Sequence, residues 1–214
     1  MTLKDFYFNS NEVGVDEAGR GPLLGRVYAG AVIWNPNKSN DMINDSKKLS
    51  SKKRKIILQW IKENLIWAVG YAEVDEIDKY NILNATKLAM DRALNNLNQQ
   101  LNNTCTEDSI NIKDVIIDGT GWEKKFNSKY NIKSIVKGDA NYYSIACASI
   151  IAKEYHDEHI NSLCNDNPEL NEKYNISNNM GYGTKDHING INTFGITKYH
   201  RHTFKPCCNF QKPE

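Results

Sequence analysis

Four acidic residues stand at the ends of segments that have the pattern of β-strands. Asp16 and Glu17 end the run VGVDE, Asp118 ends DVIID and Asp139 ends SIVKGD. In an open α/β sheet, neighbouring strand ends open onto one crevice, where ligands usually bind. If these strands are neighbours, the four carboxylates converge and repel one another unless cations sit among them. Hard divalent ions with oxygen ligands, Mg²⁺ or Mn²⁺, are the expected occupants.

Each acid also has a purely structural interpretation. Asp118 could belong to a turn, and Asp139 could cap the helix that follows it. Asp16 and Glu17 could be solvated at a strand end. Because adjacent strand residues point to opposite faces, these two can share a metal only if the strand twists or bulges, or if one binds through water. The occurrence of all four acids at strand ends favours the metal site.

A glycine-rich turn follows the first two acids. Its residues Gly19, Arg20 and Gly21 combine two glycines with a guanidinium. Glycines let a backbone approach a sugar-phosphate closely, and a planar guanidinium suits a phosphate. Beside a metal pocket, such a loop could recognise the ribose 2′-hydroxyl, which distinguishes RNA from DNA. Taken alone, Gly-Arg-Gly is more typical of an ordinary hairpin turn.

These residues need a sheet to bring them together. Strand patterns occur at residues 13–17, 26–34, 67–74, 114–119 and 132–139. Apolar residues recur at helical spacing over residues 50–65, 82–101 and 145–163, with a shorter helical pattern over 185–194. The first two strands are joined by the glycine-rich turn, so we expect a hairpin. The pattern predicts an α/β sheet of about five strands followed by a helical C-terminal part.

Composition and charge limit the class of protein. A chain of 214 residues suits one domain with a modest appendage, and it has no long uncharged apolar run typical of a signal peptide or membrane helix. The five cysteines form no CxxC pair, so we expect reduced thiols in a cytoplasm. The net charge is +1, but basic runs at residues 47–55 and 199–206 could form a basic rim around an acidic pocket. Such a rim fits nucleic acid handled with metal ions, although both runs are also consistent with solvated faces.

The chain resembles the ribonuclease HII family, the type 2 ribonucleases H of bacteria. Eight strings in register carry the resemblance, from residue 13 to about residue 206: DEAGRGPLLG, DSKKLS, EIDKYNILNAT, VIIDG, VKGD, ASIIAK, GYGTKDH and HRHTFKP. The implied fold is an α/β, ribonuclease H-like mixed sheet of about five strands flanked by helices, with a helical C-terminal extension. We expect a catalytic domain over residues 1–165 and an extension over residues 166–214 packed on it.

The resemblance implies roles for individual residues. Metal-binding catalysis falls to Asp16, Glu17 and Asp118, with Asp139 as the fourth carboxylate. Six residues are implied in substrate binding: Gly19, Arg20 and Gly21 in the loop that senses the ribonucleotide, Tyr182 stacked near the junction sugar, and Lys47 and Asn81 in stretches near the substrate backbone.

The implied activity is that of an endonuclease. It would hydrolyse the RNA strand of RNA/DNA hybrids and nick on the 5′ side of ribonucleotides embedded in duplex DNA, leaving 3′-hydroxyl and 5′-phosphate ends, as in ribonucleotide excision repair. The implied mechanism is two-metal-ion hydrolysis with Mn²⁺ or Mg²⁺. The implied partner is nucleic acid, with no membrane, and we expect a monomer.

Two departures from the family pattern lie outside the four acids. Cys147 stands where alanine is common, and His156–Asp157 replaces the usual Arg-Asp, which loses a possible phosphate contact or salt bridge. His200, in the basic C-terminal run, is expected to contact phosphate or to serve the structure.

Two rival hypotheses come from other functional classes. A nucleic-acid-binding module that has lost its chemistry is disfavoured by the complete set of four acids. Another metal nuclease or phosphatase is disfavoured by the Gly-Arg-Gly loop and Tyr182.

Overall fold

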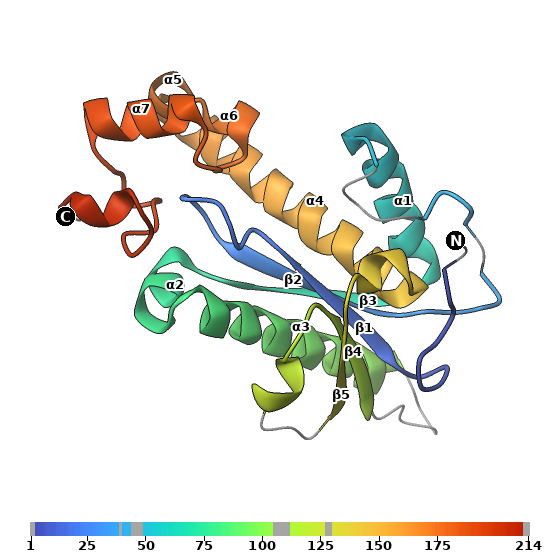
Figure 1. Cartoon of the computed structure of the whole chain (residues 1–214). Coiled ribbons are helices and arrows are strands. Elements are labelled where there is room, and N and C mark those ends of the chain that lie inside the picture. The colour runs from blue at the N-terminus through green and yellow to red at the C-terminus, as the bar shows by residue number, and fades with distance from the viewer. Residues whose placement is uncertain (1–2, 39, 44–48, 105–111, 127–129, 212–214) are drawn as a thin grey trace.

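A mixed five-stranded sheet with helices on both faces forms the centre of the chain (Figure 1). The structure is a computed structural model that describes residues 3–38, 40–43, 49–104, 112–126 and 130–211. The strands are β1 (Val13–Ala18), β2 (Val27–Ile33), β3 (Ile66–Ala72), β4 (Asp114–Asp118) and β5 (Asn131–Ile135). Their order across the sheet is β3-β2-β1-β4-β5. The three strands β1, β2 and β3 run antiparallel, whereas β4 and β5 continue the sheet parallel to β1. The expected mixed sheet and the expected hairpin are both confirmed.

The burial of each strand follows its place in the sheet. All seven residues of β2 are buried, as are the first four of β1. Strands covered on both faces consist of nearly continuous apolar residues. At the edge of the sheet, β3 instead mixes buried and exposed positions. Two of the strands with buried apolar runs, β1 and β4, carry acids at or near their ends.

Helices cover both faces of this sheet. The long α3 (Ile82–Thr104) packs on one face, and α4 (Tyr143–Asp166) together with α1 (Ser51–Asn64) packs on the other (Figure 1). The helix α4 approaches the sheet closely, because a Cβ added at Gly30 would lie 2.3 Å from the carbonyl oxygen of Ala148. Only glycine fits at that position of β2. The same contact places one face of α4 beside the end of β1.

Shorter helices gather at one end of the molecule. They are α5 (Glu169–Tyr174), α6 (Ile176–Asn179) and α7 (Lys185–Phe194), beside the C-terminal half of α4 (Figure 1). Their apolar side chains share a buried cluster with Leu23 and Leu24, which lie in the loop between β1 and β2. The C-terminal helices therefore contact the loop that follows the first two acids.

Two segments differ from the sequence prediction. The strand expected to end at Asp139 ends at Ile135 instead, and Asp139 lies in the 3₁₀ helix η3 (Gly138–Ala140). Lys137 has a φ of 54°, a left-handed conformation that cannot continue a strand. Val74 begins the helix α2 (Val74–Tyr80) rather than ending β3, because the N–H of Glu73 donates to the Glu76 carboxylate at 2.9 Å and caps the helix.

Two further observations concern the cysteines and the length and polarity of the helices. The four cysteines in the described ranges, Cys147, Cys164, Cys207 and Cys208, are free thiols. Across these ranges, each helix is too short or too polar to span a bilayer.

Candidate active site

A cleft of about 540 Å³ opens where β1 ends. It draws its residues from β1, the loop after it, α1, α4 and the segment between α6 and α7. The lining residues are Asp16, Glu17, Ala18, Gly19, Arg20, Gly21, Arg54, Ser149, Lys153 and Tyr182. Two of the predicted acids, the whole Gly-Arg-Gly loop and the predicted tyrosine are among them. Segments far apart in the sequence thus meet in one concave surface.

Three of the predicted acids interact through their charges. The parallel register of β1 and β4 pairs Val15 with Ile117, so Asp16 and Asp118 come next at the same edge of the sheet. Burial raises the pKa of the Asp16 carboxyl well above its usual range, and the negative charges of Glu17 and Asp118 raise that pKa further. The N–H of Glu17 also donates to Asp16 Oδ1 at 2.7 Å. The end of the sheet is therefore a concentrated region of negative charge.

The fourth acid, Asp139, lies beside this group. Its side chain is buried in η3, the 3₁₀ helix that follows β5. The neighbouring Gly138 N–H donates to Asp118 Oδ1 at 2.7 Å, which ties η3 to the end of β4. Asp118 and Asp139 are not among the residues that line the cleft.

Carboxylate oxygens are suitable ligands for a hard divalent ion, but in the described residues these oxygens do not surround one common point. Within the described ranges, no group of three or more His, Cys, Asp or Glu side chains is placed to hold a metal ion. Glu17 Oε1 is paired with Arg20, and Asp118 Oδ1 accepts from Gly138. The pKa of Asp16 is raised first by burial and then by the charges of Glu17 and Asp118, and a bound cation would offset these charges. The donor set, carboxylate oxygens, is of the type that Mg²⁺ and Mn²⁺ prefer.

The Gly-Arg-Gly loop needs its first glycine. Gly19 has a φ of 87°, and a Cβ there would lie 2.5 Å from Cδ2 of the His156 ring. The positive φ and this close approach both exclude a side chain. His156 is fully buried beneath the loop, and burial lowers the pKa of its imidazole.

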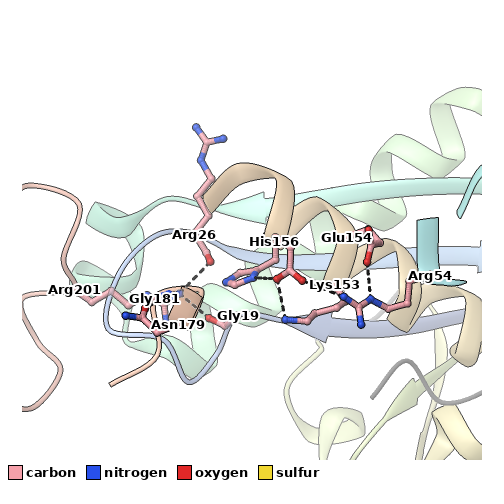
Figure 2. Close-up of polar contacts among 10 residues, drawn as sticks. Gly19, Arg26, Arg54, Lys153, Glu154, His156, Asn179, Gly181 and Arg201 are labelled. Carbon is pink, nitrogen blue, oxygen red and sulfur yellow. Dashed lines mark hydrogen bonds and ion pairs between the residues drawn. The ribbon is translucent and has the colours of Figure 1, made fainter. Parts of the chain in front are cut away.

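A buried arginine also holds this loop. Arg201 is fully buried, and its guanidinium donates to five backbone carbonyls, two of them those of Gly19 and Arg26 (Figure 2). Sequence reasoning missed this residue. Its only signal in the sequence is its place in the string HRHTFKP, between two histidines.

Tyr182 lines the cleft next to the glycine-rich loop. A Cβ built on Gly21 would come 3.2 Å from Tyr182 Cε1, so the ring lies close to the loop. The ring remains 42% exposed, which leaves a face open to a ligand. The stacking role of Tyr182 stays a prediction.

Two buried histidines fix the backbone of Tyr182. Burial lowers the pKa of His187 and that of His200, the latter to about 3, so both rings are neutral at pH 7. His187 Nδ1 lies 2.9 Å from the Tyr182 carbonyl, and the two Nε2 atoms lie 3.0 Å apart. His200 Nδ1 accepts from the Thr197 N–H, so His200 Nε2 donates to His187 and His187 Nδ1 donates to Tyr182. His200 therefore serves the structure, one of its two expected roles.

Two basic side chains of the cleft were not predicted as site residues. Arg54 had been noted only within the basic run, and Lys153 only within the string ASIIAK. Asp157 accepts from Lys153 at 2.8 Å and from Arg54 at 3.4 Å, while Glu154 pairs with Arg54 (Figure 2). This network presents two cations at the cleft. Asp157 thus keeps cationic partners although the preceding residue is a histidine.

The last two predicted substrate residues lie elsewhere. Asn81 caps α3, because its Oδ1 accepts from the N–H groups of Leu83 and Asn84 at 3.0 and 3.1 Å. It is exposed and is not among the cleft-lining residues. Lys47 lies outside the described residues. The substrate roles of both stay predictions.

The sheet order and the acids at its end define an α/β protein of the ribonuclease H-like class. The chain is similar in structure to the ribonuclease HII in the PCNA:RNase HII complex from Archaeoglobus fulgidus, with a TM-score of 0.68, 19% identity, and coverage of 91% of this chain and 95% of that one. It is also similar to Bst-RNase HIII in complex with Mn²⁺, with a TM-score of 0.61, 17% identity, and coverage of 85% and 69%. These likenesses show the fold.

The sequence comparison gives the family. The chain belongs to the ribonuclease HII family, whose model matches residues 13–207. It is 44% identical over 200 residues to the ribonuclease HII of Wolbachia sp. subsp. Brugia malayi (strain TRS), which covers 93% of this chain and 90% of the relative. Its enzyme class is therefore ribonuclease H, a hydrolase that cleaves RNA internally in RNA/DNA hybrids. The resemblance drawn from the eight sequence strings is confirmed.

Proposed function

We propose that this ribonuclease H also nicks duplex DNA on the 5′ side of embedded ribonucleotides, leaving 3′-hydroxyl and 5′-phosphate ends, as in ribonucleotide excision repair. One observation carries the proposal: the Gly-Arg-Gly loop and the buried acid Asp16 line the same cleft. A loop of glycines lets the backbone approach one sugar closely. Beside a group of carboxylates, that loop can select the 2′-hydroxyl at the bond to be cleaved.

The acids Asp16, Glu17, Asp118 and Asp139 are proposed to hold two divalent ions, Mn²⁺ or Mg²⁺. The support is the raised pKa of Asp16, caused by burial and by its neighbours' charges. A further support is the Mn²⁺ in the complex of Bst-RNase HIII, whose fold is similar. When bound, the ions would activate a water molecule and stabilise the leaving 3′-oxygen. The chain's own contribution is to hold four negative side chains at the end of one sheet.

The other cleft residues are proposed to hold the substrate. Gly19, Arg20 and Gly21 would contact the ribose and its phosphate, and Tyr182 would stack near the junction sugar. Arg54 and Lys153 line the same cleft and would attract the phosphate backbone. Base identity should matter little, because contacts to sugar and phosphate carry no sequence information.

The oligomeric state, the cellular location and the domain organisation of the enzyme are part of the same proposal. We expect a monomer that acts in the cytoplasm, with a catalytic domain over residues 1–165 and a helical extension over 166–214. The free thiols of the four described cysteines support a reducing compartment. Light scattering at working concentration tests the monomer.

The decisive test uses three labelled duplexes of one sequence: all DNA, DNA with one ribonucleotide, and an RNA/DNA hybrid. With Mg²⁺ or Mn²⁺, we expect a single nick 5′ of the lone ribonucleotide, several cuts in the hybrid and none in DNA. EDTA should abolish both reactions. Cuts in the hybrid with an intact single-ribonucleotide duplex would disprove the nicking proposal. Binding to all three without cleavage in either metal would favour the rival, a binding module.

A further inference from the structure

Arg201 is an unusual charge to find in a protein interior. It is the largest fully buried side chain in the described part of the chain, with 0% of its surface exposed. A buried charge is costly unless every polar atom finds a partner. The described hydrogen-bond partners of this guanidinium are backbone carbonyls, and all belong to the loop between β1 and β2.

The guanidinium uses each of its N–H donors once. Nη2 donates to the carbonyls of Gly19 at 2.6 Å and Arg26 at 3.0 Å, Nη1 to those of Arg20 at 3.1 Å and Pro22 at 2.8 Å, and Nε to that of Gly25 at 2.9 Å. An arginine side chain has five N–H donors in a planar fork, and this loop supplies five acceptors. The match fixes the loop along its whole length, as Figure 2 shows for its two ends.

The direction of these carbonyls fixes the direction of the neighbouring N–H groups. In the described ranges the single cis peptide bond is Lys205–Pro206, so the peptides of the loop are trans. In a trans peptide the N–H points away from the C=O of the same unit. The carbonyls of Gly19 and Arg20 point to Arg201, so the N–H groups of Arg20 and Gly21 point to the opposite side. Arg20 and Gly21 both line the cleft, and Arg201 does not, so we infer that this opposite side is the one that faces the cleft.

We propose that Arg201 is a positioning residue for recognition of the ribonucleotide: it holds the loop carbonyls inward so that the N–H groups of Arg20 and Gly21 face the ribose and phosphate of the substrate. This inference rests on the function proposed above, in which the loop senses the 2′-hydroxyl. Arg201 does not line the cleft and acts through the loop.

A lysine at position 201 could not form the same set of hydrogen bonds. Its ammonium has three donors on a flexible stem, so at least two carbonyls of the loop would lose their partner. Burial lowers the pKa of Arg201 to about 9, which leaves the guanidinium charged at neutral pH. The buried ring of His156 also lies against this loop, because a Cβ added at Gly19 would lie 2.5 Å from its Cδ2.

The test compares Arg201→Lys with the control Arg92→Lys. Arg92 pairs with Glu76 and donates to the Tyr71 carbonyl, away from the cleft. The readout is kcat/KM for a duplex with one ribonucleotide, divided by kcat/KM for the same duplex with a 2′-fluoro nucleotide at that position. Loss of folded protein lowers both values equally, whereas a displaced loop changes their ratio. We expect the ratio to fall about 10-fold to 100-fold in Arg201→Lys and to stay unchanged in Arg92→Lys.

Hydrogen–deuterium exchange separates this inference from the proposed function. Peptides covering residues 19–26 should exchange faster in Arg201→Lys, whether or not the wild type nicks at a lone ribonucleotide. An unchanged ratio in a variant whose wild-type parent discriminates the two substrates would overturn the inference, as would unchanged exchange in these peptides. If Arg201→Lys does not fold, the wild type labelled with ¹⁵N-arginine decides. Slowly exchanging, separate Nη–H signals for Arg201 support the inference, and one averaged, rapidly exchanging signal overturns it.

Discussion

Arg20 Nη1 lies 2.9 Å from Glu17 Oε1, so the loop that is proposed to bind substrate is paired with an acid that is proposed to bind metal. The Arg20 side chain is 44% exposed, whereas that of Glu17 is 14% exposed. An ion pair with one exposed partner stabilises a protein by only about 0–1 kcal/mol. Arg20 and a bound metal therefore compete for Glu17, and Arg20 is easily released toward a phosphate.

This competition predicts the effect of Arg20→Gln on metal binding. Without nucleic acid, the variant should bind Mn²⁺ up to about fivefold more tightly, because no ion pair has to break and no cation repels the metal. The same variant should cleave more slowly, since it lacks a phosphate contact. Calorimetric titration with Mn²⁺ measures the affinity. Arg92→Gln, which breaks the Glu76 pair outside the cleft, is the control and should leave the affinity unchanged. A weaker affinity in Arg20→Gln would contradict the competition.

Asp118→Asn should abolish cleavage while leaving duplex binding nearly intact. The substitution removes negative charge beside Asp16 and keeps the size of the side chain. We expect single-turnover cleavage to fall by at least about 100-fold, because positioned charge is usually the largest catalytic contribution. Fluorescence anisotropy measures binding.

Asp114→Asn is the matched control for Asp118→Asn. Asp114 begins the same strand and accepts hydrogen bonds from the side chains of Asn9 and Asn131, away from the cleft. Its variant should cleave at the wild-type rate. Near-normal turnover by Asp118→Asn would remove Asp118 from the catalytic group.

Local patterns in the sequence were enough to predict the sheet and its acids. The strands β1 and β4 are short apolar runs that end in carboxylates, and this pattern depends only on neighbouring residues. The bend before Asp139 was not predictable in this way. It depends on the left-handed φ of Lys137, and lysine gives no sign of such a conformation.

Contacts between distant segments explain what the sequence could not predict. Arg201 bonds with carbonyls that precede it by 175 to 182 residues, and hydrogen bonds of that span leave no periodic pattern. The sequence also could not show whether Asp157 keeps a salt bridge when His156 replaces the usual arginine before it. The salt bridges of Asp157 persist because Lys153 lies one helical turn away and Arg54 comes from another helix.

Tyr182→Ala should reduce the preference for a lone ribonucleotide. The ring lies beside Gly21 with an exposed face, and loss of a stacked aromatic ring costs about 1–3 kcal/mol in nucleic-acid binding. The measurement is kcat/KM on a duplex with one ribonucleotide relative to a duplex with four. Tyr182→Phe keeps the ring and should keep most of the preference.

Tyr80→Ala is the control for this substitution. Tyr80 is 43% exposed, close to the 42% of Tyr182, but it is not among the residues that line the cleft. Its variant should cut both duplexes in the wild-type proportion. An unchanged proportion in Tyr182→Ala would argue against the stacking role.

The buried pair of His187 and His200 makes stability depend on pH. Burial lowers the pKa of His200 to about 3, far below the 6.5 of a free histidine. Between about pH 3 and pH 6.5, His200 is mostly protonated in the unfolded chain and mostly neutral in the folded chain. The free energy of unfolding therefore has its full contribution from His200 above pH 6.5 and loses it as the pH falls.

Urea unfolding at pH 8 and at pH 5 tests this dependence. For His200 alone, we expect the free energy of unfolding to fall by about 2 kcal/mol between these pH values, since pH 5 lies about 1.5 pH units below the unfolded pKa and each unit contributes about 1.4 kcal/mol. Other groups also titrate in this interval, including His159, whose pKa burial lowers to about 4. His200→Gln removes the titration of His200 and leaves the other groups. The fall in the free energy of unfolding in the wild type, minus the fall in the variant, therefore gives the contribution of His200. If the fall is equal in the wild type and the variant, His200 takes up its proton at the same pH in the folded and the unfolded chain, and burial does not lower its pKa.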